Sequence, residues 1–338
     1  MTTSTPAPSS DRADQPGGPS ITAVPATGGR AGGGRRIDTS DASFATRLRR
    51  GPVGTAATDA AKHALRRYAM ATAGSRRGPE LVVVGAKRGG TTSLWKYLDS
   101  HPGILPTFPR AEQIKGTYYF DEEWDRGDRW YRSHFPTDRA RARAADELGY
   151  EPVTFEASPY YLFHPHAPAR ARLTVPDATI VALLRDPVER AFSHYKERRN
   201  HTEPLSFAEA LAAEEERTGG EEARMLADPT VVSPAHRHQT YVAQSRYAPM
   251  LERWFAAFDR DQVLVAPAEE FYADPQTFCD QITDRLGIPR HDLGSPEPFN
   301  SEPSADMDED VRTRLRASLK DDIEAVERLL GRPMPWER

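Results

Sequence analysis

The chain has 338 residues, of which 38% are hydrophobic and 28% are charged, and its formal net charge at pH 7 is −5. These proportions are ordinary for a globular protein, and no stretch approaches the ~20 apolar residues that a membrane-spanning helix needs. The N-terminus has no basic segment leading into an apolar run, so the sequence predicts no secretory signal. The single cysteine, Cys279, excludes an internal disulfide and a thiolate metal cluster and is predicted to be a packed thiol. Together these features predict a cytoplasmic protein with no membrane partner.

Charge and composition divide the chain into two parts. Residues 1–78 carry 12 Lys and Arg against 5 Asp and Glu, so this part has a net charge of +7 and the remainder has −12. An acidic main body argues against a nucleic-acid partner. Residues 1–40 lack large apolar side chains and are predicted to be disordered, and residues 43–70 are predicted to form one weak amphipathic helix. We therefore expect a disordered or weakly helical leader over 1–78 and a single folded domain over 79–338.

From residue 79 onward, short apolar runs alternate with segments of helical periodicity. The predicted strands are residues 80–85, 153–155, 178–184 and 262–266. The predicted helices are residues 91–100, 188–199, 206–217, 246–258, 275–286 and 308–330. This alternation predicts an α/β domain with a mainly parallel sheet and helices on both faces. Ligands bind beyond the C-terminal ends of strands in such sheets, so we expect a site in the loops after Val84 and Leu184.

The first predicted strand runs into a glycine-rich loop over residues 85–93, Gly-Ala-Lys-Arg-Gly-Gly-Thr-Thr-Ser. The glycine spacing is that of a phosphate-binding P-loop, but Thr91 stands where the usual lysine would be, and the lysine is Lys87. Gly89 and Gly90 let the backbone bend close to an anion, and the amides that open the following helix favour phosphate. A plain turn between strand and helix is the alternative. The fold is therefore predicted to be P-loop-like.

The end of the strand at 178–184 bears on the kind of nucleotide. An enzyme that uses a nucleoside triphosphate would need an acidic Mg²⁺ ligand at the end of a neighbouring strand, but Arg185 follows this strand. A cation there suits a second phosphate on the ligand, so no metal is expected, and a Mg²⁺-dependent P-loop kinase becomes the weaker alternative. The His-x-His pairs at 164–166 and 236–238 are predicted to lie in loops or a cleft.

Two motifs carry a resemblance to a known family. Residues 87–94, Lys-Arg-Gly-Gly-Thr-Thr-Ser-Leu, and residues 185–195, Arg-Asp-Pro-Val-Glu-Arg-Ala-Phe-Ser-His-Tyr, resemble the two phosphate motifs of sulfotransferases that use 3′-phosphoadenosine-5′-phosphosulfate (PAPS). The similarity is to the branch of heparan sulfate N- and 3-O-sulfotransferases and their bacterial relatives, and it covers about residues 80–336. It implies transfer of a sulfuryl group from PAPS to a small-molecule or carbohydrate acceptor, leaving the product PAP.

The resemblance also implies roles for individual residues. Lys87 would stabilise the leaving phosphate oxygen, Arg185 and Ser193 would hold the 3′-phosphate, and Tyr247 would lie near the nucleotide. The loop residues expected to bind the phosphosulfate end of the donor are Lys87, Arg88, Gly89, Gly90, Thr91, Thr92 and Ser93.

The chain departs from the heparan-type pattern on the acceptor side. There a Lys-Glu-x-His-Phe-Phe segment supplies a glutamate as general base, whereas residues 115–120 here put Gly116 in place of that glutamate and Tyr118 in place of the histidine. Ala157 replaces a lysine. The candidates for a substitute base are Glu112, Glu156, His134 and Asp121. A non-catalytic relative that binds PAP therefore stays open as an alternative. Most of the aromatic residues between 118 and 135 are predicted to be core or cleft wall. Because the resemblance implies that this segment borders the acceptor, we expect a cyclic acceptor, either a sugar or an aromatic metabolite.

Overall fold

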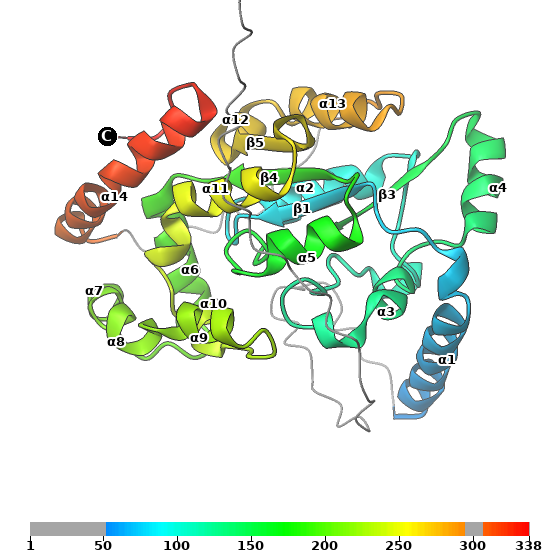
Figure 1. The fold of residues 1–338 in the computed structure, drawn as a ribbon, viewed down its shortest axis with the longest axis horizontal. Coiled ribbons are helices and arrows are strands. Elements are labelled where there is room, and N and C mark those ends of the chain that lie inside the picture. Colours follow the sequence, from blue (N-terminus) through cyan, green and yellow to red (C-terminus); the bar gives the residue numbers. More distant parts are fainter. Residues whose placement is uncertain (1–51, 295–306, 338) are drawn as a thin grey trace, which may run out of the picture. The chain divides into compact units, whose positions relative to one another are not determined.

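The computed structural model describes residues 52–294 and 307–337, and at its centre lies a five-stranded sheet (Figure 1). The strand order is β2-β3-β1-β4-β5, and all four neighbouring pairs are parallel. The strands are β1 Leu81–Gly85, β2 Ile104–Leu105, β3 Val153–Ala157, β4 Thr179–Leu184 and β5 Val263–Pro267. The predicted parallel α/β sheet is therefore confirmed.

The apolar run of β1 reflects a strand that is buried on both faces. Leu81 and Val83 join one hydrophobic cluster, whereas Val82 and Val84 join the other, because successive side chains of a strand point to opposite faces. The first cluster is completed by helices α2 Thr91–Ser100, α12 Ala268–Ala273 and α13 Pro275–Leu286. The second is completed by α5 Ala167–Thr174, α6 Pro187–Arg199, α11 Tyr247–Ala257 and α14 Glu309–Leu330. Helices thus cover both faces, as predicted.

The other helices lie mostly outside these two layers, and all of them except the 20-residue α1 are short. They are α1 Pro52–Ala71, α3 Asp128–Arg132, α4 Asp138–Leu148, α7 Phe207–Ala212, α8 Glu214–Thr218, α9 Glu221–Ala227 and α10 Pro234–His238. The helix predicted at 206–217 is therefore two helices. The predicted start of the first of them is confirmed, because Ser206 and Glu209 form a capping box there. Cys279 is buried in α13, and burial raises the pKa of its thiol to about 12, in agreement with the predicted packed thiol.

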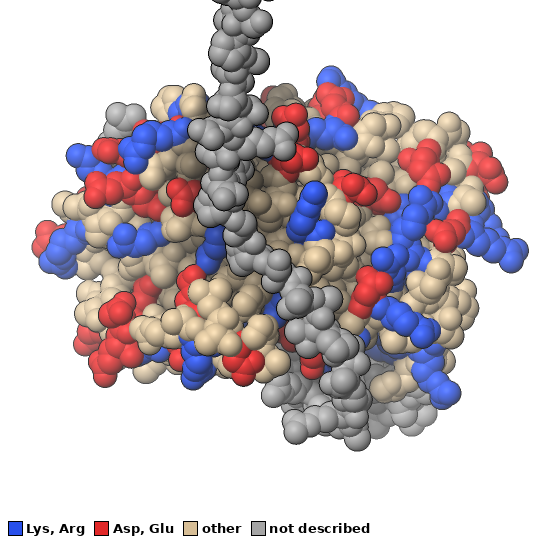
Figure 2. All heavy atoms as spheres, viewed as in Figure 1, with Lys and Arg blue, Asp and Glu red and all other residues tan. Residues whose placement is uncertain are grey.

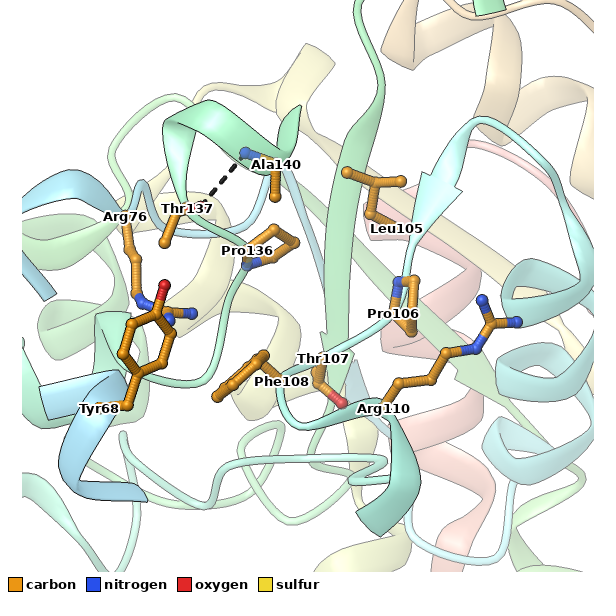
Figure 3. Close-up of a pocket in the computed structure, with 10 residues that line it drawn as sticks. All are labelled: Tyr68, Arg76, Leu105, Pro106, Thr107, Phe108, Arg110, Pro136, Thr137 and Ala140. Carbon is orange, nitrogen blue, oxygen red and sulfur yellow. Dashed lines mark hydrogen bonds between the residues drawn. The ribbon is translucent and has the colours of Figure 1, made fainter. Parts of the chain in front are cut away.

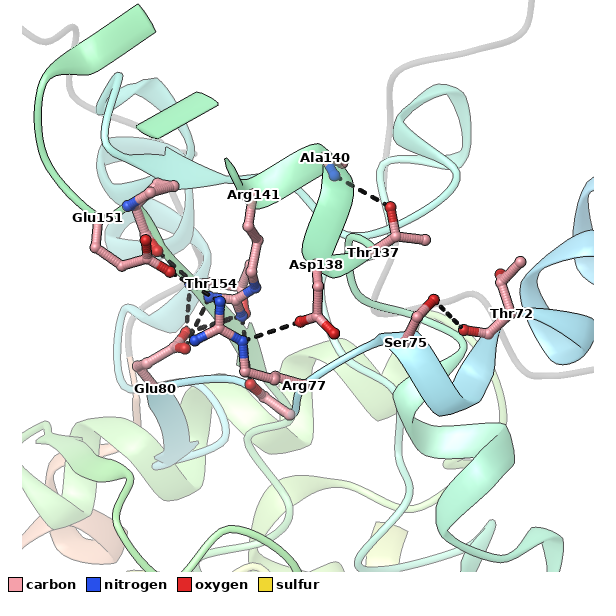
Figure 4. A network of polar contacts seen from close by, with 12 residues as sticks. Thr72, Ser75, Arg77, Glu80, Thr137, Asp138, Ala140, Arg141, Glu151 and Thr154 are labelled. Carbon is pink, nitrogen blue, oxygen red and sulfur yellow. Dashed lines mark hydrogen bonds and ion pairs between the residues drawn. The ribbon is translucent and has the colours of Figure 1, made fainter. Parts of the chain in front are cut away.

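A polar network joins α4 to the start of the sheet (Figure 4). The guanidinium of Arg141 is fully buried and donates to the carboxylate of Glu80 at 2.8 Å and to Oγ1 of Thr154 at 2.9 Å. The backbone N–H of Thr154 donates to the same carboxylate at 2.8 Å. Beside it, the exposed Arg77 pairs with Asp138 at 3.1 Å. The buried part of this network fixes the entry into β1 and β3, whereas an exposed pair contributes only about 0–1 kcal/mol.

Helix α1 lies within the stretch that the sequence assigned to the leader. The part of the predicted helix 43–70 that precedes residue 52 lies outside the described residues, as does the segment 1–40 that was predicted to be disordered. Arg66 on α1 donates a hydrogen bond to the carbonyl of Phe108. The described end of the predicted leader thus contacts the domain. None of the described helices combines the length and the apolarity needed to cross a membrane.

The surface in Figure 2 mixes both signs of charge. Lys and Arg side chains lie among Asp and Glu side chains over the face that is shown. Exposed ion pairs also occur on the described part of the chain, such as that between Arg290 and Asp284 at 2.6 Å. Interspersed charges of this kind favour solubility and add little to the free energy of folding.

Candidate active site

The loop between β1 and α2 forms a close turn that only glycine can make. Gly90 has φ 93° and is the N-cap of α2. A Cβ at Gly89 would lie 2.6 Å from the carbonyl oxygen of Leu183 and 2.9 Å from that of Ala86. Ser93 N–H donates to the Gly90 carbonyl at 3.0 Å, whereas the amides of Thr91 and Thr92 precede the first hydrogen bond of the helix and are of the kind that suits an anion. The glycine pair therefore lies at the turn into α2, where the sequence predicts an anion-binding loop.

The second predicted motif begins where β4 ends. Asp186 caps α6, because its Oδ1 accepts hydrogen bonds from the amides of Val188 at 2.9 Å and Glu189 at 3.1 Å. One turn further along, Ser193 Oγ accepts a hydrogen bond of 3.1 Å from Arg88 Nε. The two motifs, 105 residues apart in the chain at this contact, thus meet at the same end of the sheet.

Arg185, which follows β4, keeps part of its side chain accessible. Its guanidinium is 3.8 Å from the carboxylate of Glu189, and 36% of the side chain is exposed. Tyr247 is buried, and its hydroxyl donates to the Arg185 carbonyl at 2.8 Å. Arg190, by contrast, is fully buried and donates to Ser245 Oγ at 2.7 Å, and burial lowers its pKa to about 10. Arg190 holds the fold together, whereas Arg185 has accessible surface with which to meet a ligand.

Lys87 belongs to the 85–93 loop, and only 3% of its side chain is exposed. Its ammonium nitrogen is 3.7 Å from Oε2 of Glu197 on α6, a side chain that is 8% exposed. The sequence analysis missed Glu197. The residue lies in the run Lys-Glu-Arg-Arg at 196–199, which is typical of a solvated helix face. The carboxylate is buried because α6 packs against the loop, and this contact between distant segments is not visible in the sequence.

The segment over residues 115–120 touches the start of α2. The ammonium of Lys115 donates to the hydroxyls of Thr91 at 3.1 Å and Thr92 at 2.9 Å. At Gly116, a Cβ would lie 2.5 Å from the carbonyl oxygen of Ala157 and closer still to Ser158 Oγ. This segment therefore lies flush against the end of β3, and the space for a glutamate side chain at 116 is taken by the backbone.

Glu156, a predicted base, has both carboxylate oxygens engaged in the core. It is fully buried, and its Oε2 accepts hydrogen bonds from the N–H of Thr117 at 2.7 Å and from Ser158 Oγ at 3.0 Å. Its Oε1 accepts from the hydroxyl of Tyr131 at 2.9 Å. Burial raises the pKa of Glu156, and the donors from Thr117 oppose that shift. This geometry argues against Glu156 as a base and makes it the group that holds the 115–120 segment in place.

The other three candidate bases lie in different surroundings. Glu112 is half-buried on a 3₁₀ turn, Arg110–Glu112, near the charge of Arg66. His134 is packed as a neutral ring, because burial lowers its pKa to about 3 while its Nδ1 lies 2.9 Å from the Trp130 carbonyl. Asp121 is fully buried, and burial raises its pKa to about 7. The ionisation of Asp121 therefore falls near neutral pH.

Most of the aromatic residues between 118 and 135 belong to the core. Tyr119, Phe120, Tyr131 and Phe135 are buried in the same hydrophobic cluster, and the rings of Tyr119 and Tyr131 stack with centroids 4.6 Å apart. The expectation that most of these residues belong to the core or a cleft wall is therefore confirmed for these four. Tyr118 is half-buried, and the guanidinium of Arg237 lies 5.1 Å from the centre of its ring.

A cavity of about 310 Å³ lies beside the β2 edge of the sheet (Figure 3). Tyr68 of α1, Phe108 and Arg76 line one side of it, and Figure 3 shows these three side chains close together. The guanidinium of Arg76 is 4.6 Å from the centre of the Phe108 ring. The residues that line the cavity do not include those of the 85–93 loop, so this cavity is separate from the predicted anion site.

The His-x-His pair at 164–166 lies in a loop, as predicted, but the pair at 236–238 lies on helix α10, so the prediction of a loop is wrong for that pair. His236 Nδ1 lies 2.6 Å from the hydroxyl of Tyr160, and His166 Nε2 lies 2.8 Å from the carbonyl of Met225. Over residues 52–294 and 307–337 there is no group of three or more His, Cys, Asp and Glu placed to hold a metal ion.

The sheet and the two segments that follow β1 and β4 define a class of protein. A parallel α/β sheet carries a glycine-rich loop after its central strand and an arginine after the neighbouring strand, as in P-loop-like proteins. The family model described as the sulfotransferase family matches residues 79–292. The chain belongs to the sulfotransferase family.

Relatives place it in the branch that the motifs predicted. It is 30% identical over 218 residues to the bifunctional heparan sulfate N-deacetylase/N-sulfotransferase 4 of Mus musculus, covering 63% of this chain and 23% of that protein. It is 30% identical over 217 residues to the heparan sulfate glucosamine 3-O-sulfotransferase 6 of Homo sapiens, covering 64% and 54%. The matched region thus spans about a quarter to a half of those two proteins. The crystal structure of a sulfotransferase from Alicyclobacillus acidocaldarius superposes with a TM-score of 0.54 at 30% identity, over 76% of this chain and 97% of that one.

Proposed function

We propose that the chain transfers a sulfuryl group from PAPS to a hydroxyl or amine of a small-molecule or sugar acceptor, leaving PAP. The observation that carries this proposal is the hydrogen bond between Arg88 Nε and Ser193 Oγ. It joins the two motifs that, by resemblance, hold the two phosphate-bearing ends of the donor. Both motifs therefore face one ligand rather than two.

The residues present fit such a donor. Gly89 and Gly90 form a cradle that a side chain would fill, since a Cβ at Gly90 would lie 2.9 Å from the Tyr272 hydroxyl. The hydroxyls of Thr91 and Ser93 lie at the N-terminus of α2, where the helix dipole and the amides of the first turn favour phosphate and sulfate oxygens. Amides, hydroxyls and guanidinium groups suit oxyanions, and they do so without a metal ion.

Each part of the site then has a distinct task. PAPS supplies a sulfuryl group attached to a good leaving phosphate. Lys87 would stabilise the charge that develops on the leaving phosphate oxygen, which is the kind of fixed electrostatic help that lowers a barrier most. The amides at the start of α2 would hold the 5′-phosphate, and Arg185 with Ser193 would hold the 3′-phosphate.

The proposal is tested first by binding. Titration calorimetry with PAP and with ATP, each with and without Mg²⁺, should show PAP binding that does not depend on the metal. Radiolabelled PAPS is then offered with a panel of sugars, phenols and amines. Sugars come first in the panel, because two of the relatives are heparan sulfate sulfotransferases. Mg²⁺-dependent ATP binding with no response to PAP would instead support a P-loop kinase.

A second candidate function has one observation in its favour. The Ser158 hydroxyl and the Ala157 carbonyl occupy the space beside Gly116, where the heparan-type pattern has its base. This observation favours a chain that binds PAP without transferring sulfate. Such a chain would bind PAP in the calorimeter and leave PAPS intact with every acceptor. The cytoplasmic location stays a prediction from the sequence.

A further inference from the structure

Glu197 presents a buried carboxylate oxygen beside the phosphate loop. Its side chain is 8% exposed, and within the described part of the chain its Oε2 has no hydrogen-bond partner. The cation nearest to this oxygen is the ammonium of Lys87, at 3.7 Å. The other oxygen, Oε1, accepts only a long hydrogen bond of 3.4 Å from Arg198. A buried charged oxygen that is left without a hydrogen bond is costly, so it calls for an explanation.

The position of Glu197 on α6 directs it toward the loop. Ser193 and Glu197 are four residues apart and therefore lie on the same face of the helix. Ser193 contacts Arg88, and Glu197 contacts Lys87, so this face lies against the residues that follow β1. Glu197 is thus a neighbour of the lysine that the resemblance assigns to the leaving oxygen.

The surroundings make a carboxylate unexpected here. Lys87, Arg88 and Arg198 are cationic, and they suit a ligand that carries phosphate and sulfate. His194, one turn before Arg198, is fully buried, and burial together with the charge of Lys87 holds its pKa well below the ordinary value. A carboxylate in such a place repels the donor that the site is built to attract. Its presence therefore indicates a task in the reaction rather than in donor binding.

We propose that Glu197 is the general base of the transfer reaction, in the place of the glutamate that Gly116 excludes. This inference rests on the proposed function. The acceptor oxygen forms a bond to the sulfur, and its proton passes to the carboxylate of Glu197. The bond between the sulfur and the bridging oxygen breaks, and that oxygen keeps the electron pair as part of the phosphate of PAP, beside Lys87. Atoms and charge balance without a metal or a further reactant.

Lys87 would couple the two halves of this step. In the structure the ammonium is paired with Glu197. When a donor phosphate binds Lys87, Oε2 of Glu197 loses its cationic neighbour, while Oε1 keeps its contact with Arg198. Oε2 then becomes available to the acceptor when the donor is present.

The test compares Glu197→Gln with Glu209→Gln. The first change removes the base and keeps the size of the side chain. The second makes the same change in charge at an exposed carboxylate on α7, outside the site. Radiolabelled PAPS is offered with water, para-cresol and para-nitrophenol as acceptors. We expect Glu197→Gln to lower kcat with para-cresol by about 10²–10⁴-fold, the usual contribution of a general base. The loss with para-nitrophenol should be smaller, because that phenol ionises readily without a base, and Glu209→Gln should match the wild type.

Two further readouts separate a base from a structural counter-ion. Calorimetry should show PAP binding to Glu197→Gln about three- to tenfold more tightly, because a nearby negative charge is removed. The acid limb of the pH profile of kcat should disappear in this variant and return, with part of the activity, in Glu197→Asp.

Three outcomes are informative. An equal loss with both phenols together with weaker PAP binding would show that Glu197 only holds Lys87, and that would overturn the inference. So would a Glu197→Gln variant that keeps kcat within about threefold and retains the acid limb, since a general base contributes far more than that. A wild-type chain that fails to bind PAP or to consume PAPS with any acceptor would instead refute the proposed function itself.

Discussion

Replacing Gly116 with the glutamate of the heparan-type enzymes should damage this protein rather than give it a better base. A Cβ at residue 116 would lie 2.5 Å from the Ala157 carbonyl oxygen, where ordinary contacts begin near 3.4 Å. The 115–120 segment would have to move away from β3. That movement would stretch the hydrogen bond from the Ala157 N–H to the Lys115 carbonyl, now 2.8 Å, and the one from the Thr117 N–H to Glu156, now 2.7 Å.

The size of the effect follows from these contacts. Loss of a buried hydrogen bond costs about 1–3 kcal/mol, and overpacking costs a similar amount, so we expect Gly116→Glu to lower the free energy of unfolding by about 2–5 kcal/mol. For a domain of this size each kcal/mol corresponds to about 2–4 °C, which predicts a fall in Tm of about 5–15 °C. Gly116→Ala should show most of this loss, because the clash begins at Cβ.

Thermal and denaturant unfolding measure the loss, and radiolabelled PAPS measures turnover in the same samples. Gly74→Ala is the matched control, because a Cβ there meets nothing within 4 Å. Its Tm should stay close to that of the wild type. A Gly116→Glu variant that is as stable as the wild type and turns over faster would show that the segment has room for a base, and our explanation of the missing glutamate would be wrong.

Three further predictions concern single charges. Lys87→Ala should lower kcat by about 10²-fold or more while PAP affinity changes much less, and Lys96→Ala, an exposed lysine on α2, should match the wild type in the same kinetic assay. Arg185→Ala should raise the KM for PAPS by about 10–100-fold, the loss of one charge-assisted contact, and an unchanged KM would remove Arg185 from the donor site. Burial raises the pKa of Asp121 to about 7, so the folded chain holds a proton that the unfolded chain releases above about pH 4, and stability should fall as pH rises between these values. Urea unfolding over this range should give a flatter profile for Asp121→Asn, and an unchanged slope would contradict the assignment.

The central strands could be predicted because their burial is visible in the sequence. Residues of β1 and β4 face packed helices on both sides, so the runs are apolar without interruption. Strand β2 has only two residues, which is too short for any periodicity to show. Helix α4 buries Arg141 rather than an apolar side chain, so its core-facing position looks like part of a charged surface.

The site divides along the same line. The proposed donor side consists of contiguous motifs, and their glycines, hydroxyls and cations are recognisable from the sequence alone. Lys87, Arg88 and Ser193 could therefore be named as candidates before the structure was known. The acceptor side depends on which distant segments pack together. Nothing local distinguishes Glu197, buried beside Lys87, from an exposed carboxylate on a helix, or Glu156, held by core donors, from a reactive one.

The contact of Lys115 with Thr91 and Thr92 has a thermodynamic consequence. The ammonium lies on the segment that, in the proposed function, would border the acceptor, and its two partners belong to the helix that would receive the donor. A phosphate bound at the start of α2 would either draw the Lys115 ammonium away from Thr91 and Thr92 or hold it there more tightly. Either effect changes the position or the mobility of the 115–120 segment. Affinities for the two substrates are then linked, and by reciprocity the factor by which PAP alters acceptor binding must equal the factor by which the acceptor alters the binding of PAP.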